Sequence, residues 1–383
     1  MQNFAYQKID TVAEAVSAAA ALATRFVAGG TTLIDLMKLN VENPHTVLDI
    51  NSLPLTKIER TADGGWRIGA MVRNSDLAHD KIVQQEYAVL SQALLSGASP
   101  QLRNMATTGG NLLLRTRCYY FRDTVYACNK REPGSGCPAL DGFNRIHAVL
   151  GTSEHCIATH PSDRAVAMMA LEALVHTSWP KGERSVPLNE FYLLPGNTPQ
   201  RENVLAAGEL ITHVTLPKLP GGTRSYYLKR RDRASYEFAL ASAAVVAGLQ
   251  SGNFQYIRIA LGGVGTKPWR STEAEAVLRG KPANDASFRA AAEAALHGAK
   301  PMHDNAFKVE LAKRTLVRAL QTATQPASRG THEHFTYWQA DQPHRRPAEG
   351  KWTLPIRNRI PYSKPRLRGC RYKHHRERTH YGN

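Results

Sequence analysis

The alternation of apolar and polar residues predicts short strands and amphipathic helices up to about residue 324. Apolar residues at intervals of three and four predict helices, and short apolar or alternating runs between turn residues predict strands. The predicted helices lie at 11–23, 33–39, 76–97, 163–176, 272–278, 287–296 and 305–323. The predicted strands lie at 25–28, 46–50, 58–60, 66–70, 211–216, 225–233 and 256–261. Helices and strands are mixed along the chain, which predicts an α+β fold.

Two glycine pairs interrupt this pattern. Gly29 and Gly30 stand between the strand 25–28 and the helix 33–39, a layout that turns free backbone N–H groups toward an anion. The second pair lies in the sequence Thr-Thr-Gly-Gly-Asn at 107–111, where glycines allow positive φ and let a ligand reach the main chain. Taken alone, each pair is better explained by a plain tight turn. Neither has the GxGxxG spacing of a Rossmann nucleotide site.

The best internal boundary is the Pro- and Gly-rich segment 217–222. It predicts a first α+β domain over 1–222 and a second over 223–324. After residue 324 valine and methionine vanish, and the remaining residues follow neither the strand period nor the helix period. Residues 325–383 are therefore predicted to form a disordered basic tail, or to come from a shifted reading frame that was never selected to fold.

The charge of the chain is unevenly placed. Of the net +17, +9 lies after residue 324, where 13 Lys and Arg face 4 Asp and Glu. The folded body is therefore expected to bind no nucleic acid.

No apolar run approaches the ~20 residues of a membrane span, so no membrane partner is expected. The N-terminus has no basic region followed by an apolar stretch, and we expect no secretory signal in this chain.

Four of the five cysteines fall in a loop-like insert at about 115–158: Cys118, Cys128, Cys137 and Cys156. Five cysteines in 383 residues are too few for a disulfide-stapled scaffold, so a metal site is expected. No gap has the CxxC spacing of zinc ribbons, whereas Pro138 after Cys137 is typical of ferredoxin loops. Basic residues that would offset an anionic cluster lie between the cysteines: Arg122, Lys130, Arg131 and Arg145. Spacing leaves three interpretations open, namely a [4Fe–4S] cluster, a zinc site and unligated thiols.

Four segments, in this order and spacing, resemble the FAD-binding subunit of the molybdenum hydroxylases. They are 26–34 (FVAGGTTLI), 106–111 (ATTGGN), 161–163 (PSD) and 261–265 (LGGVG). That family includes xanthine dehydrogenase, carbon monoxide dehydrogenase and aldehyde oxidoreductases. The cysteine-bearing insert is similar to the branch that holds a [4Fe–4S] cluster in this subunit, the bacterial periplasmic aldehyde oxidoreductases. The resemblance covers residues 1 to about 324 and leaves out the tail.

The resemblance implies a two-part FAD-binding domain of the vanillyl-alcohol-oxidase (PCMH) type, followed by a smaller α+β domain of the CO-dehydrogenase flavoprotein type. It assigns the two glycine segments to the phosphates and ribityl chain of FAD, and Lys229 to the neighbourhood of the isoalloxazine. The implied FAD contacts are Phe26, Val27, Ala28, Gly29, Gly30, Thr31, Thr32, Leu33, Ile34, Thr108, Gly109, Gly110, Asp163, Ile211 and Lys229. Three of them also have structural explanations: a helix cap for Asp163, core packing for Ile211 and surface charge for Lys229.

The resemblance implies electron transfer as the function, with FAD and a [4Fe–4S] cluster on Cys118, Cys128, Cys137 and Cys156. The implied partners are a small [2Fe–2S] subunit and a large molybdenum-cofactor subunit that oxidises an aldehyde to a carboxylic acid. The expected location is the periplasm, by export with a signal-bearing partner, and the cytoplasm is the alternative. A competing interpretation, a basic nucleic-acid-binding protein with a four-cysteine zinc site, leaves the glycine turns unexplained.

Overall fold

The computed structural model of the chain describes residues 1–21 and 23–325. Residues 326–383 of the predicted basic tail, including Cys370, lie outside the described residues. In the described part, no helix has both the length and the apolar character that crossing a bilayer requires.

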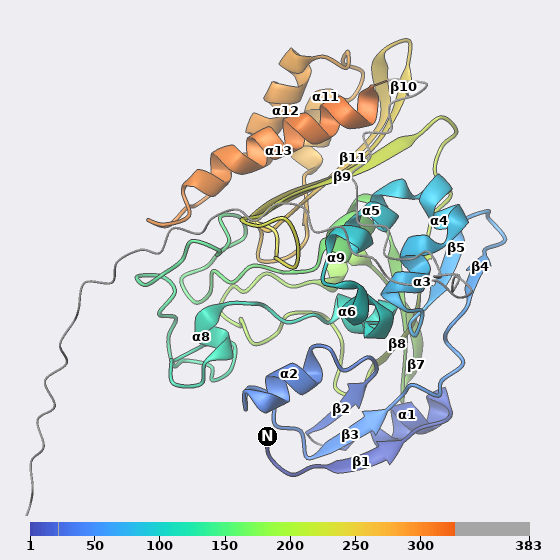
Figure 1. The fold of residues 1–383 in the computed structure, drawn as a ribbon, viewed down its shortest axis with the longest axis vertical. Coiled ribbons are helices and arrows are strands. Elements are labelled where there is room, and N and C mark those ends of the chain that lie inside the picture. The colour runs from blue at the N-terminus through green and yellow to red at the C-terminus, as the bar shows by residue number, and fades with distance from the viewer. Residues whose placement is uncertain (22, 326–383) are drawn as a thin grey trace, which may run out of the picture. The chain divides into compact units, whose positions relative to one another are not determined.

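The N-terminal part is a small parallel sheet flanked by two short helices (Figure 1). Its three strands are ordered β1-β3-β2, and the two outer strands both pair in parallel with the central one. Thr11 caps the first helix by accepting a hydrogen bond from the backbone N–H of Glu14. The elements are β1 (Ala5–Lys8), α1 (Val12–Ala18), β2 (Thr24–Val27), α2 (Leu33–Lys38) and β3 (Thr46–Asp49).

A five-stranded antiparallel sheet forms the middle of the molecule, in the order β4-β5-β8-β6-β7. The predicted hairpin at 58–60 and 66–70 is confirmed as its first two strands. The strands are β4 (Ile58–Arg60), β5 (Trp66–Gly69), β6 (Leu174–Trp179), β7 (Gly182–Pro187) and β8 (Leu210–Leu216). The helices of this part are α3 (Asn74–His79), α4 (Lys81–Glu86), α5 (Ala88–Ser96), α6 (Pro100–Met105), α7 (Thr108–Leu112), α9 (Asp163–Ala170) and α10 (Leu188–Phe191).

The helix predicted at 163–176 is too long. α9 ends at Ala170, and Glu172 adopts a left-handed conformation with φ of 54°. The backbone N–H of Ala173 then donates to the carbonyl oxygen of Met168, which closes the helix as a Schellman-type turn does. The apolar run continues beyond this turn as strand β6, which includes His176.

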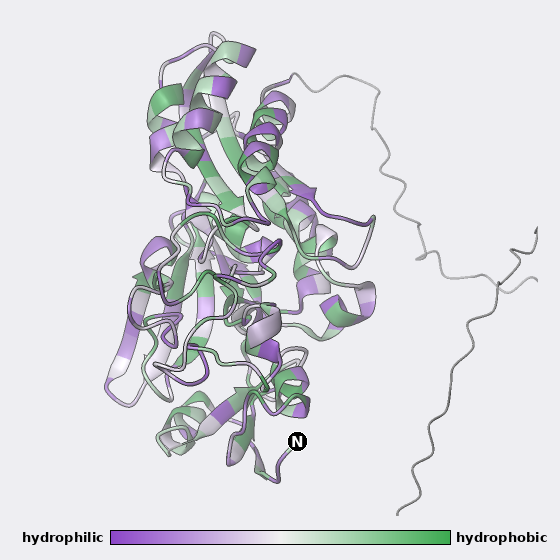
Figure 2. Ribbon diagram, turned by 90° about the vertical axis from the view of Figure 1, so that its left-hand side faces the viewer, coloured by the Kyte–Doolittle hydropathy of each residue, from purple (hydrophilic) through white to green (hydrophobic). Residues whose placement is uncertain are grey.

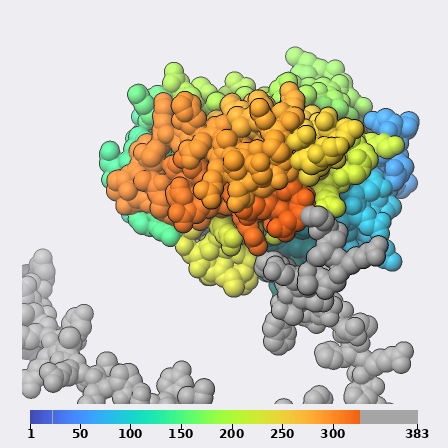
Figure 3. All heavy atoms as spheres, turned by 90° about the horizontal axis from the view of Figure 1, so that it is seen from above, coloured from blue at the N-terminus to red at the C-terminus, as the bar shows by residue number. Residues whose placement is uncertain are grey.

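The C-terminal part is a four-stranded antiparallel sheet with three helices on its outer face (Figures 1 and 3). The helices agree with those predicted at 272–278, 287–296 and 305–323. The elements are β9 (Arg224–Arg230), β10 (Ala241–Gln250), β11 (Asn253–Gly262), β12 (Trp269–Arg270), α11 (Thr272–Leu278), α12 (Asp285–Leu296) and α13 (Phe307–Thr324).

Both faces of this sheet are buried. Ala244 and Val246 of β10 belong to the core that includes α5 and α9, whereas Ala243 and Val245 belong to the core under α11, α12 and α13. This explains the continuous run of small apolar residues in β10, because a strand covered on both faces has no polar side. Figure 2 shows the strands of this C-terminal sheet as mostly hydrophobic, and the helices that flank it as mixed.

The insert between α7 and α9 is loop-like. Residues 113–162, all of which the structure describes, contain one short helix, α8 (Tyr119–Arg122), and isolated bridges. The predicted loop character of the cysteine-bearing segment is therefore confirmed.

Candidate functional site

The two glycine segments lie against each other. A Cβ atom on Gly29 would fall 1.9 Å from the carbonyl oxygen of Met105, the last residue of α6. Only glycine therefore fits at position 29, because a backbone atom cannot move aside as a flexible side chain can. Gly30 has a φ of 69°, which turns the chain from β2 toward α2. The close approach fixes the β2–α2 turn beside the Thr-Thr-Gly-Gly-Asn segment.

The Thr-Thr-Gly-Gly-Asn segment is the start of a helix, which corrects the prediction of a turn with positive φ. Thr107 caps α7 by accepting a hydrogen bond from the N–H of Gly110 at 3.3 Å, and neither Gly109 nor Gly110 has a positive φ. The N–H of Gly109 donates to the carbonyl oxygen of Ala70 at 2.8 Å. A Cβ atom on Gly109 would approach the Ala70 side chain to 3.2 Å. Glycine is thus used here for its lack of a side chain.

A cavity of about 510 Å³ opens along these two segments. Its wall also includes β8 and the loop 200–209. Ten of the residues predicted to contact FAD line it: Phe26, Ala28, Gly29, Gly30, Thr31, Thr32, Leu33, Gly109, Gly110 and Ile211. The structure therefore brings both glycine segments and Ile211, which are far apart in sequence, to one concave surface.

The other five predicted contacts do not line this cavity. Val27 belongs to a small apolar cluster, Ile34 is exposed, and the buried Thr108 hydroxyl donates to a backbone carbonyl. Lys229 and Asp163 form a buried ion pair with an Nζ–Oδ2 distance of 2.8 Å. Their roles as FAD contacts stay predictions.

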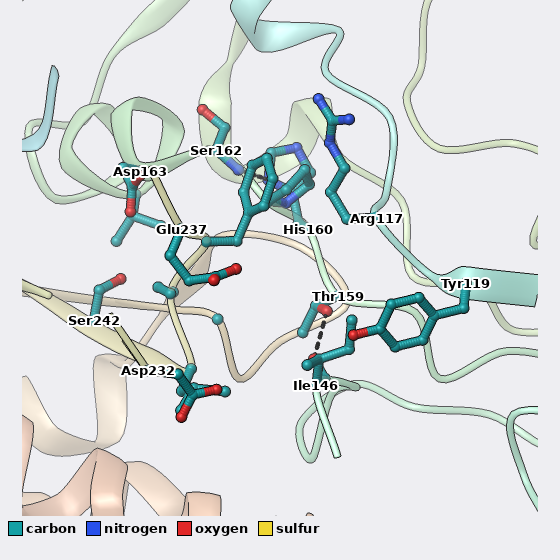
Figure 4. A pocket seen from close by; sticks show the side chains of 17 residues that line it. Arg117, Tyr119, Ile146, Thr159, His160, Ser162, Asp163, Asp232, Glu237 and Ser242 are labelled. Carbon is teal, nitrogen blue, oxygen red and sulfur yellow. Dashed lines mark hydrogen bonds between the residues drawn. The ribbon is translucent and has the colours of Figure 1, made fainter. Parts of the chain in front are cut away.

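A second, smaller cavity of about 150 Å³ shares part of its wall with the first. Figure 4 shows the side chains that line this smaller cavity. Thr159, His160 and Pro161 line both cavities, and Asp163 lines the smaller one. The Nε2 atom of His160 is buried, and within the described residues it has no hydrogen-bond partner. Burial lowers the pKa of His160 to about 4, so its ring is neutral near pH 7. His160 is a functional candidate that no sequence motif singles out.

A group of charged side chains joins the larger cavity to the insert. Glu202 accepts from Lys130 at 2.9 Å and also pairs with Arg115, which contacts Glu42 in turn. Burial alone would raise the pKa of Glu202, but the charges of Lys130 and Arg115 outweigh it and the pKa is lowered. Glu202 is therefore ionised at neutral pH. Sequence reasoning misses this group, because its members are up to 160 residues apart.

The four cysteines of the insert line one small cavity: Cys118, Cys128, Cys137 and Cys156. Cys137 is partly exposed and the other three are buried. Lys130 and Cys156 line this cavity and the larger one alike. The free space is about 10 Å³, the room of roughly one water molecule, so the thiols would have to move apart around a four-iron cluster.

Burial keeps two of these thiols protonated near neutral pH. Burial raises the pKa of Cys118 to about 12 and that of Cys156 to about 11. Both are therefore neutral thiols at pH 7 unless a metal replaces their protons. Residues 1–21 and 23–325 contain no group of three or more His, Cys, Asp or Glu placed to hold a single metal ion.

Comparison with protein families shows the class of protein to which the chain belongs. Residues 2–219 match the FAD binding domain in molybdopterin dehydrogenase, and residues 196–323 match the CO dehydrogenase flavoprotein C-terminal domain. The chain belongs to the family of FAD-binding medium subunits of the molybdenum hydroxylases, and it is thus an oxidoreductase subunit. The predicted fold class is confirmed, and the nucleic-acid-binding alternative loses its support.

Three individual proteins show how similar the chain is to members of this family. The chain is 54% identical to the aldehyde oxidoreductase FAD-binding subunit PaoB of Escherichia coli over 326 residues, 84% of this chain and 99% of that protein. It is 30% identical to the glyceraldehyde dehydrogenase medium chain of Sulfolobus acidocaldarius, over 68% of this chain and 75% of that one. A chain in a solved structure of the Hydrogenophaga pseudoflava carbon monoxide dehydrogenase matches with a TM-score of 0.67 and 28% identity, over 84% of this chain and 97% of that chain.

Proposed function

We propose that this chain is the electron-transferring FAD and iron–sulfur subunit of a molybdenum-dependent aldehyde oxidoreductase complex. The observation that carries the proposal is the 54% identity to the aldehyde oxidoreductase subunit over 99% of that protein's length. Identity at this level over a whole subunit supports a shared partner set and reaction. The cavities supply the physical basis.

The larger cavity suits the extended diphosphate part of FAD. Gly29, Gly30 and Gly110 line this cavity, so their main chain forms part of its wall without a side chain of their own. The smaller cavity, beside Asp163 and His160, offers polar groups for the flavin ring. Bound FAD can exchange one or two electrons, and the protein positions it and tunes its potential. The Nε2 atom of neutral His160 is then available to exchange a hydrogen bond with the ring.

The insert is proposed to hold a [4Fe–4S] cluster on its four cysteines. Four thiols around one cavity match the ligand number of such a cluster. The insert is loop-like and cannot bury a core of its own, so metal ligation would supply its ordering free energy. Cys156 and Lys130 line both cavities, which supports a cluster close to the proposed FAD site.

The remaining parts of the proposal concern organisation. The FAD-binding domain is assigned to 1–222, with the insert at about 115–158, and the C-terminal domain to 223–324. A small [2Fe–2S] subunit would deliver electrons from a large molybdenum-cofactor subunit, where the aldehyde is oxidised. The complex is proposed to be a heterotrimer in the periplasm. Finding the assembled complex only in the cytosolic fraction would refute this location.

The FAD site is tested by Gly110→Val. The new side chain would project near the Thr107 hydroxyl, which lies 3.0 Å from a Cβ at this position, and into the wall of the larger cavity. A clash of about 1–3 kcal/mol lowers affinity roughly 5- to 150-fold, so the purified variant should lose most of its FAD. FAD per chain is measured by absorbance after release. Gly298→Val is the control, because no atom lies within 4 Å of a Cβ there. Full FAD occupancy in Gly110→Val would contradict the assignment.

The cluster is tested by iron and acid-labile sulfide per chain after anaerobic purification. About four of each are expected, because four thiolates complete a [4Fe–4S] centre. Replacing Cys128 with Ser should abolish both and make the insert more sensitive to protease, while FAD remains bound. One zinc per chain without sulfide would overturn the proposal.

A further inference from the structure

A buried histidine contacts one of the four cysteines. His147 is fully buried, and its Nε2 atom lies 3.1 Å from the Sγ atom of Cys118. Its Nδ1 atom has no hydrogen-bond partner in the described structure. With the proton assigned to Nε2, His147 donates to the sulfur of Cys118.

Lys308 of α13 holds the backbone of this histidine. The Lys308 side chain is fully buried, and its Nζ atom donates to the carbonyl oxygens of His147 at 2.7 Å, Ile146 at 3.1 Å and Gly263. All three ammonium protons are therefore used. Asn305 also donates to the His147 carbonyl oxygen. The C-terminal domain thus fixes the segment that presents His147 to the cysteine.

The charge of Lys308 is not compensated by a carboxylate. Three of the four basic residues that lie between the cysteines already have acidic partners: Arg122 with Asp35, Lys130 with Glu202 and Arg145 with Asp232. Arg131 donates to backbone carbonyl groups and is only partly buried. Lys308, by contrast, is buried and has no ion-pair partner among the residues that the structure describes. Burial, followed by the charge of Arg145, lowers the pKa of Lys308 to about 7, so a negative charge near it is needed to keep it fully protonated at pH 7.

We propose that His147 and Lys308 raise the reduction potential of the cluster assigned to the insert, an inference that rests on the proposed function. A [4Fe–4S] centre with four thiolates is anionic, and its reduction adds one more negative charge. An N–H···S hydrogen bond and a nearby cation both stabilise the reduced form more than the oxidised form. Lys308 acts as a positioning residue through His147, and it also contributes its charge.

The test is a redox titration of the cluster, followed by electron paramagnetic resonance, on the anaerobically purified full chain. His147→Leu removes the N–H donor, and Lys308→Met removes the charge at similar size. Each variant should retain wild-type iron and sulfide but show a more negative midpoint potential. At a fixed potential, the ratio of reduced to oxidised cluster is expected to be about tenfold lower in each variant than in the wild type. For a one-electron couple this corresponds to a shift of ~59 mV in midpoint potential.

Two further variants separate this role from a structural one. His147→Gln keeps an N–H donor and should have a potential close to that of the wild type. Lys313→Met removes the same charge from the same helix, but Lys313 pairs with Glu293 and is partly exposed, so no shift is expected.

The outcomes distinguish the two proposals. Wild-type protein without sulfide would overturn the cluster and this inference together. A wild-type cluster with unchanged potentials in His147→Leu and Lys308→Met would overturn only the inference. Loss of iron in His147→Leu, in Lys308→Met and in His147→Gln would show that His147 and Lys308 have a structural role. That outcome would also overturn the inference about the reduction potential.

Discussion

At the scale of single residues, a pair of stacked histidines bears on stability. His176 of β6 and His213 of β8 are cross-strand partners, and their rings are 4.1 Å apart and nearly parallel. Burial, the neighbouring His176 and Arg67 together lower the pKa of His213 to about 4. Burial also lowers the pKa of His176, and Arg67 adds to that effect while Glu183 opposes it. The pair is therefore packed as neutral rings.

We predict that the protein loses stability as the pH falls from 6.5 toward 4. Over this range the unfolded chain binds a proton at position 213 that the folded chain excludes, because the pKa of His213 falls from 6.5 to about 4 on folding. The melting temperature, followed by circular dichroism, should fall more gently with pH in His213→Gln than in the wild type. His45→Gln, at an exposed position, serves as the control and should keep the wild-type slope. Equal slopes in all three proteins would contradict this explanation.

At the scale of secondary-structure elements, one ion pair connects helix α9 with strand β9. Asp163 accepts from Lys229 at 2.8 Å and from the Tyr227 hydroxyl at 2.6 Å. The two charged side chains are 8% and 4% exposed, so water does little to screen them. Breaking a buried pair from one side leaves an uncompensated charge, which is the costly change.

We predict that Lys229→Met lowers the free energy of unfolding by about 3–5 kcal/mol. The double variant Asp163→Asn with Lys229→Met should recover a large part of this loss, since no buried charge remains. Urea denaturation measures the free energy of unfolding of the single and the double variant. Glu293→Gln, which removes an exposed pair with Lys313, should change stability by less than about 1 kcal/mol. A double variant no more stable than Lys229→Met would show that the charge is not the cause.

The elements differ in how well the sequence predicts them. The predictions at 272–278 and 287–296 agree with α11 and α12, because each has a clear apolar stripe and a capping residue, Ser271 or Asn284. Strands β1 and β7 lie at sheet edges with mostly exposed side chains, so no apolar pattern marks them. Local pattern therefore predicts the helices that have a one-sided apolar stripe. It misses the exposed edge strands β1 and β7, and it also misses β10, whose small buried residues do not alternate with polar ones.

At the scale of the whole molecule, the sites depend on contacts that no local pattern records. The glycine segments were recognisable in the sequence, but the approach of Gly29 to Met105 joins positions 76 residues apart. The neighbours of the cysteines are more distant still, since Lys308 reaches the backbone of His147 from the last helix. Motif residues could be predicted, whereas the residues that hold them in place could not.

The C-terminal sheet, which is buried on both faces, also determines when the core around α5 and α9 can be completed during translation. A nascent chain that ends near residue 222 has made α5 and α9 but not the strands that cover them. At ~5–20 residues per second, the forty residues from 223 to 262 take roughly 2–8 s to translate. For that time the apolar surface of these helices faces the cytosol, where a chaperone or a premature contact can reach it.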